Sequence, residues 1–171
     1  TDGTCFAALE TGATFTRMPP LEAEGDCGVD PRLRLTAAAG MTIPPLETTC
    51  RSALRLAMWL EHAVRPASEV LGAAPTAIRH QGSYNCRAIR GGTRLSSHAT
   101  GSAIDVAGVT LDDGRRLELI DGWAGDGPEA AFWRGARDGA CRWFVTVLGP
   151  DFNAAHADHF HLQAMGWGLC R

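Results

Sequence analysis

The sequence predicts an α+β fold, with a small central antiparallel sheet and flanking helices. Two segments, residues 48–72 and 127–141, place apolar residues at helical spacing. Short stretches such as 102–111 and 159–165 have the lengths and apolar patterns of strands. The chain has 171 residues, enough to bury a core of its own, so a single domain over 1–171 is expected.

Residues 1–47 are expected to form an irregular arm packed on a catalytic core of residues 48–171. The arm contains two Pro-Pro pairs and several turn-forming residues, which disfavour regular structure. Within it, residues 29–39 are expected to supply one short strand.

The first helix is expected over 48–72. Thr48 or Thr49 can cap its beginning, since a hydroxyl can accept from the free backbone amides there. Pro66 is expected to kink or interrupt it, and Gly72 to end it.

The later elements follow in order. Residues 102–111 are expected to form a strand, and 111–119 resemble a hairpin with Asp113 and Gly114 at its turn. The remaining elements are a strand beginning in 75–89, a helix over 127–141 with Pro128 in its first turn, and strands within 142–149 and 159–165.

Six scattered cysteines without a CxxC pair favour three disulfides and an oxidising compartment. The alternative is six reduced, buried thiols in a cytosolic protein. The favoured pairing joins Cys5 with Cys27, Cys50 with Cys86, and Cys141 with Cys170. No signal peptide and no apolar run long enough for a membrane span is recognisable, so export is inferred from the cysteines.

The formal net charge of -3 argues against a nucleic-acid partner, because a phosphate backbone is bound by basic surfaces. The oligomeric state is left open by the sequence.

Two histidine-rich stretches suggest a metal site. In "SSHATGSAID", Gly101 and its small neighbours let the backbone turn tightly enough for His98 and Asp105 to converge. In "HADHFH", His159 and His161 project from the same face of the expected strand. Catalytic zinc uses three such ligands and a water, so Zn²⁺ on His98, Asp105 and one of the two later histidines is the predicted cofactor. The alternative is a turn capped by Asp105 with hydrogen-bonded surface histidines.

The first stretch resembles the SxHxxGxAxD motif of the LAS-type zinc peptidases, which include lysostaphin-like endopeptidases, D-Ala-D-Ala peptidases and hedgehog domains. The matching residues are Ser96, His98, Gly101, Ala103 and Asp105. This resemblance implies a LAS-type fold with zinc held by His98, Asp105 and His161.

The resemblance offers two candidates for the catalytic base. His159 matches the base or transition-state stabiliser of many members, whereas Asp158 stands where the dipeptidase branch has a glutamate base. We favour His159. The spacing of His156, His159 and His161 is also similar to that of the penicillin-insensitive murein endopeptidases.

The same resemblance implies a substrate-binding set. "GSYNCRAIRGGTRLSSH" is similar to the SGYR…GG…SxH stretch of related peptidases, although the motif's arginine falls on Asn85. Arg87 could take its role by gripping a substrate carboxylate, the alternative being a surface ion pair. The substrate-binding candidates are Tyr84, Arg87, Ser96 and His156.

Nearly the whole chain resembles the bacterial extensin-like C-terminal domain family, from "CRSALRLAMWLEHAV" to the closing "GWGLCR". Together the two resemblances imply a periplasmic or otherwise exported zinc metallopeptidase acting on peptidoglycan stems or cross-links, with endopeptidase action favoured over carboxypeptidase action. The alternatives are a zinc-containing module that binds cell-wall peptide or protein without turnover, and a disulfide-rich structural domain without metal.

Overall fold

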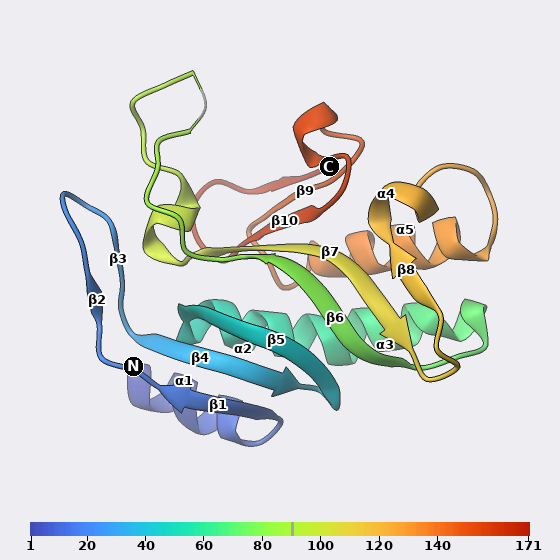
Figure 1. Cartoon of the computed structure of the whole chain (residues 1–171), viewed down its shortest axis with the longest axis horizontal. Coiled ribbons are helices and arrows are strands. Elements are labelled where there is room, and N and C mark those ends of the chain that lie inside the picture. Colours follow the sequence, from blue (N-terminus) through green and yellow to red (C-terminus); the bar gives the residue numbers. More distant parts are fainter. Residues whose placement is uncertain (90) are drawn as a thin grey trace.

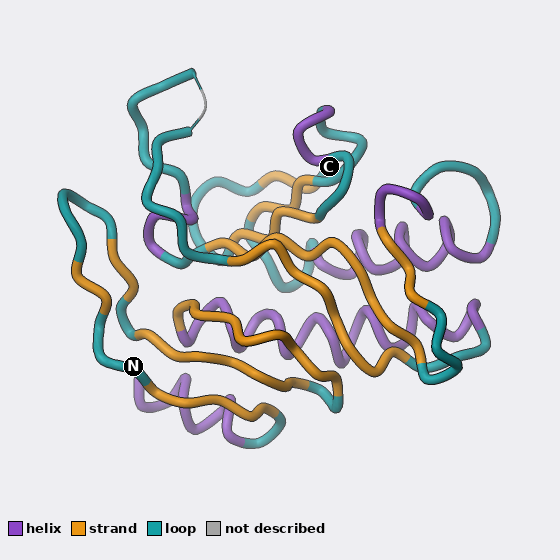
Figure 2. The backbone as a smooth tube through the Cα atoms, viewed as in Figure 1, coloured by secondary structure: helices purple, strands orange, loops and turns teal. Residues whose placement is uncertain are grey.

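The computed structural model describes residues 1–89 and 91–171 and shows a large mixed sheet with helices packed behind it (Figures 1 and 2). Over the described residues the main sheet has nine strands, in the order β1-β4-β5-β6-β7-β10-β9-β11, with β8 paired to β7. The expectation of helices with a sheet is confirmed, but the sheet is large rather than small. It is mostly antiparallel, with parallel pairs β5–β6 and β9–β11.

The strands of the main sheet are β1 (Ala13–Arg17), β4 (Arg32–Ala38), β5 (Met41–Thr49), β6 (Pro75–Gly82), β7 (Ala103–Leu111), β8 (Arg116–Glu118), β9 (Thr146–Leu148), β10 (Phe160–Gln163) and β11 (Leu169–Cys170). A separate ribbon pairs β2 (Leu21–Glu22) with β3 (Gly28–Val29). The hairpin expected at 111–119 is present as β7–β8.

The α-helices are α1 (Asp2–Glu10), α2 (Cys50–Trp59), α3 (Arg65–Ala67), α4 (Leu119–Gly122) and α5 (Pro128–Ala140). A π-helical turn η1 (Leu60–Val64) and the 3-10 turns η2 (Ser68–Leu71), η3 (Ser97–Thr100) and η4 (Ala154–His156) complete the set. The long helices α2 and α5 lie behind the sheet in Figure 1, so one sheet face is buried against them.

The prediction of an irregular arm over residues 1–47 is wrong. This segment contains α1, β1, β4 and most of β5, and it adds three strands to the main sheet. The strand expected within 29–39 is confirmed as β4, where Leu33 and Leu35 are fully buried. The Pro44-Pro45 pair lies within β5, at an interruption of its ladder with β4, where the missing amides cost no hydrogen bonds.

The first predicted helix is present, but it changes from an α-helix to a π-helical turn along its length. Thr49 caps α2 by accepting from the Ser52 amide at 3.2 Å. The helix then widens into η1 directly before Pro66, whose ring and missing amide are incompatible with an uninterrupted α-helix. Gly72, in the left-handed conformation, ends the segment as expected.

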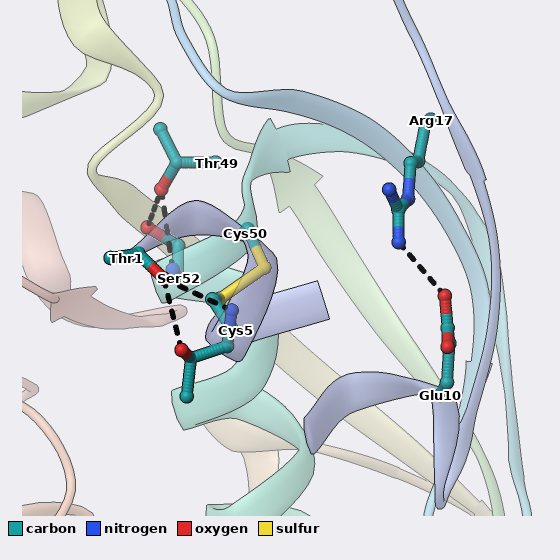
Figure 3. Close-up of a disulfide and its surroundings, with 8 residues drawn as sticks. Thr1, Cys5, Glu10, Arg17, Thr49, Cys50 and Ser52 are labelled. Carbon is teal, nitrogen blue, oxygen red and sulfur yellow. Dashed lines mark hydrogen bonds and ion pairs between the residues drawn. A yellow bond between two sulfur atoms is a disulfide. The ribbon is translucent and has the colours of Figure 1, made fainter. Parts of the chain in front are cut away.

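Three disulfides join the six cysteines, as predicted, but two of the predicted pairings are wrong. Cys141–Cys170 is confirmed, whereas the other bonds are Cys5–Cys50 and Cys27–Cys86. The reason is the unforeseen helix α1, which packs against α2 and brings Cys5 to the start of that helix (Figure 3). Cys27 is thereby left for Cys86, and this bond ties the β2–β3 ribbon to the loop after β6.

No helix among the described residues is both long enough and apolar enough to cross a membrane.

The helical layer depends on a close approach between α5 and η1. Trp59 is fully buried and donates its indole N–H to the Ala136 carbonyl at 2.8 Å. Near the end of α5, a Cβ on Gly139 would overlap the Cβ of Ala63. A glycine is therefore needed at this crossing although it weakens the helix.

We expect Gly139→Ala to lower the free energy of unfolding by about 1–3 kcal/mol, because overpacking outweighs the helix propensity of alanine. Urea unfolding followed by circular dichroism measures this. The matched control is Gly3→Ala in α1, where no atom lies within 4 Å of the new Cβ. Equal stability of the two variants would contradict the proposed crossing constraint.

Candidate metal centre

The site begins with the pairing of β7 and β10. These antiparallel strands place Asp105 directly opposite His161, and side chains in such a pair share one face of the sheet. Phe160 and Leu162 point the other way and are fully buried in the core. The alternation predicted for this strand is therefore present, and it aims His161 at Asp105.

His98 reaches the same place from the turn η3. Ser96 caps this turn by accepting from the His98 amide at 3.3 Å, and Gly101 ends it with a left-handed φ of 61°. The chain then reverses into β7, which carries Asp105. Gly101 thus provides the tight turn that the sequence predicts between the two side chains.

The Gly101 carbonyl ties this turn to the beginning of α2. It accepts from the hydroxyls of Thr48 at 2.8 Å, Ser52 at 3.1 Å and Ser83 at 3.3 Å. All three hydroxyl residues are buried. Because buried polar groups keep their geometry when each has a partner, this network holds the backbone next to His98 rigidly.

His98, Asp105 and His161 form a compact cluster. His98 Nε2 lies 3.1 Å from His161 Nδ1 and 3.2 Å from Asp105 Oδ2, and His161 Nδ1 lies 3.0 Å from Asp105 Oδ1. Ligand atoms of the three residues all lie within 4.8 Å of one another. One ion could therefore contact all three.

The hydrogen bonds of the two imidazoles leave acceptor atoms facing the cluster. His98 Nδ1 lies 2.7 Å from the Ser83 carbonyl, to which it must donate, so in the neutral ring Nε2 carries the lone pair. His161 Nε2 lies 3.4 Å from both Ser97 Oγ and Gln163 Oε1, so its Nδ1 faces inward. Such outer partners orient metal-binding histidines. Two lone pairs and a carboxylate then converge, an arrangement that suits a cation.

Asp105 and His98 shift each other's pKa values. Burial alone would raise the pKa of Asp105, but the contacts with His161 and His98, which donate to the carboxylate when they are protonated, outweigh it and hold that pKa well below its usual range. Burial disfavours the charged form of His98, yet its hydrogen bond and attraction to Asp105 leave the pKa of His98 above the ordinary value. Asp105 is therefore ionised at neutral pH.

Both candidates for the base lie beside the cluster. His159 Nε2 is 3.8 Å from Asp105 Oδ1, and its Nδ1 is 2.8 Å from Asp158 Oδ1. The His159 side chain is 12% exposed, whereas that of Asp158 is 47% exposed. The structure thus places His159 between Asp158 and the cluster.

The four predicted substrate-binding residues are spread around the cluster. Tyr84 is half-buried, and Arg87 is exposed on the loop after β6, near enough for its charge to oppose protonation of His98. Ser96 is buried in its capping role. His156 is half-buried on η4, its ring 5.2 Å from that of His159, and burial and the neighbouring histidines lower the pKa of His156 to about 4.

The contacts that orient His98, His161 and Asp158 were not predicted from the sequence. The Ser83 carbonyl is a backbone atom and has no sequence signature. Ser97 stands next to His98 in the sequence and Gln163 two positions after His161, so their contacts could have been foreseen from the motif and the strand alternation. Gln81, which binds Asp158 at 2.9 Å, could be found only from the pairing of β6 with β7.

A groove of about 1100 Å³ lies next to the turn that carries His98. Its walls include the β2–β3 ribbon and the start of α2, together with Thr100, Ser102 and Met165. His98 and Ser102 flank the same reversal of the chain, so the groove adjoins the cluster, although His98, Asp105 and His161 are not among its lining residues.

Comparison with known proteins gives one family. The family model described as extensin-like protein C-terminus matches residues 3–171. No curated protein and no solved structure matches the chain.

We expect Gly101→Ala to destabilise the protein and to weaken binding of a divalent metal by about tenfold or more. The left-handed φ costs alanine about 1–2 kcal/mol. The new Cβ would also lie 3.0 Å and 3.1 Å from the Val29 methyl groups. Chemical denaturation and metal titration measure the two effects.

The matched control is Gly72→Ala, at a φ of 68° with no atom within 4 Å of the new Cβ. This variant has only the conformational cost of the left-handed backbone, without a steric clash, and Gly72 lies outside the cluster. If both variants lose the same stability and bind metal equally, the turn at Gly101 does not position the ligands.

Proposed function

The chain belongs to the family of the extensin-like protein C-terminus, and on this premise we propose that it is a zinc-dependent hydrolase of amide bonds in peptidoglycan peptides. The observation that carries the proposal is the convergence of His98, Asp105 and His161 from three separate elements, with His159 beside them.

The donor set fits zinc better than the harder divalent ions. Calcium and magnesium prefer oxygen ligands, whereas two imidazole nitrogens and one carboxylate are a common catalytic zinc set. Three protein ligands leave a coordination position for water or substrate. The outer hydrogen bonds from Ser83, Ser97 and Gln163 are of the kind that orient such ligands.

The substrate class is supported by the resemblance to LAS-type peptidases. All five specified positions of that motif are matched within residues 96–105, and in this structure two of them, His98 and Asp105, belong to the cluster. Three disulfides fit an exported protein, which would meet the cell wall. We favour endopeptidase action on cross-links over carboxypeptidase action.

The roles of the residues follow from their positions. A zinc ion bound at the cluster would lower the pKa of water and polarise the substrate carbonyl. His98, Asp105 and His161 hold the ion, and their own contacts keep them aimed at it. His159 Nε2 accepts a proton from the attacking water and later returns it to the leaving amine. Arg87, which is exposed on the loop after β6, can bind a substrate carboxylate.

We expect one zinc ion per chain in the wild type and much less in His98→Ala, measured by elemental mass spectrometry. Digestion of purified peptidoglycan should release new muropeptides, and EDTA should abolish this release. His159→Ala should keep the zinc and lower turnover by about 10²–10⁴-fold, the usual contribution of a general base.

The matched control is His62→Ala, which removes an exposed histidine on η1 outside the cluster and should leave both zinc and turnover unchanged. A folded wild type without zinc would overturn the metal centre. Stoichiometric zinc without any new muropeptide would overturn the hydrolase and favour a module that binds wall peptide without turnover.

A further inference from the structure

A line of hydrogen bonds connects β6 to the inner histidine. Gln81 Nε2 donates to Asp158 Oδ2 at 2.9 Å, and Asp158 Oδ1 lies 2.8 Å from His159 Nδ1. A carboxylate can only accept, so His159 must carry its proton on Nδ1. Its Nε2 then faces Asp105 with a free lone pair.

Gln81 owes its position to a bulge in β6. In the ladder with β7, His80 pairs with Val106 and Gly82 pairs with Asp105, which leaves Gln81 as the extra residue. His80 Nε2 is bonded to the Pro44 carbonyl at 2.8 Å and anchors the strand on its other neighbour, β5. Bulges commonly redirect a side chain next to an active site.

The contacts of Gln81 and Asp158 lie at the protein surface. Gln81 is exposed, and the Asp158 side chain is 47% exposed. Exposed polar pairs of this kind contribute little to folding stability. Both oxygens of Asp158 are nevertheless held by donors on different elements, so the carboxylate has one orientation toward His159.

We propose that Gln81 is a positioning residue for His159 and acts through Asp158. This inference rests on the proposed hydrolase and assigns the roles of the two candidate bases: His159 exchanges the proton at Nε2, and Asp158 orients it. A hydrogen bond on one ring nitrogen determines which nitrogen is free to react. Gln81 in turn keeps Asp158 from turning into solvent.

The kinetic test compares Gln81→Ala with the control Thr76→Ala, which truncates another exposed side chain of β6. We expect Gln81→Ala to lower kcat on purified muropeptide dimers about tenfold, the lower end of the range for outer-shell contacts, with KM and zinc content unchanged. Asp158→Ala should lower kcat further, and Thr76→Ala should match the wild type.

The spectroscopic test does not require activity. Long-range proton–nitrogen correlation spectra of 15N-histidine-labelled protein, zinc-free and zinc-loaded, report the tautomer of His159 at a pH of about 8.5, above the ordinary histidine pKa. His159→Ala identifies the resonance. We expect the Nδ1–H tautomer in the wild type, a shift toward Nε2–H in Gln81→Ala, and the full change in Asp158→Ala.

The two tests distinguish a failure of the positioning role of Gln81 from a failure of the proposed hydrolase function. An inactive wild type with the expected tautomer series would overturn the hydrolase and support the positioning of His159 by Gln81. An active wild type in which Gln81→Ala has the kcat and tautomer of Thr76→Ala would overturn the positioning role and leave the hydrolase standing. An Nε2–H tautomer in the wild type would also overturn it.

Discussion

The antiparallel pairing of β7 with β10 is the constraint on which the rest of the site depends. It brings Asp105 and His161, which are 56 positions apart in the chain, to adjacent places on one sheet face. The opposite faces of the same two strands are buried among the helices. A slip by one residue would turn Phe160 and Leu162 toward solvent, so the hydrophobic effect fixes the register that also places Asp105 opposite His161.

Around this pair, the supporting contacts come from backbone irregularities. The left-handed residue Gly101 turns His98 toward the strands, and its carbonyl is held by buried hydroxyls. The bulge in β6 leaves Gln81 unpaired in the ladder and brings it to Asp158. Regular strands thus place Asp105 and His161, while a tight turn places His98 and a bulge places Gln81.

The sequence predicted the residues of the site better than the fold around it. Spacing and strand alternation were enough to select His98, Asp105 and the pair His159 and His161, because these signals are local and chemical. The choice of His161 as the third candidate ligand came from the resemblance to LAS-type peptidases. The prediction for the first 47 residues is wrong because Pro-Pro pairs suggest loops, whereas the pairing of β4 with β5 tolerates prolines where the ladder is interrupted. That pairing, like the bond of Cys5 to Cys50, is a tertiary contact that no local pattern encodes.

The order of these elements along the chain has a consequence for biogenesis. The turn at Gly101 contacts Val29, Thr48 and Ser52, which precede it in the chain, whereas His161 comes much later in the sequence. A chain that emerges with its N-terminus first therefore presents His98 and Asp105 before it presents His161. Under the proposed function, the ion would therefore be acquired only in the compartment in which β7 and β10 pair.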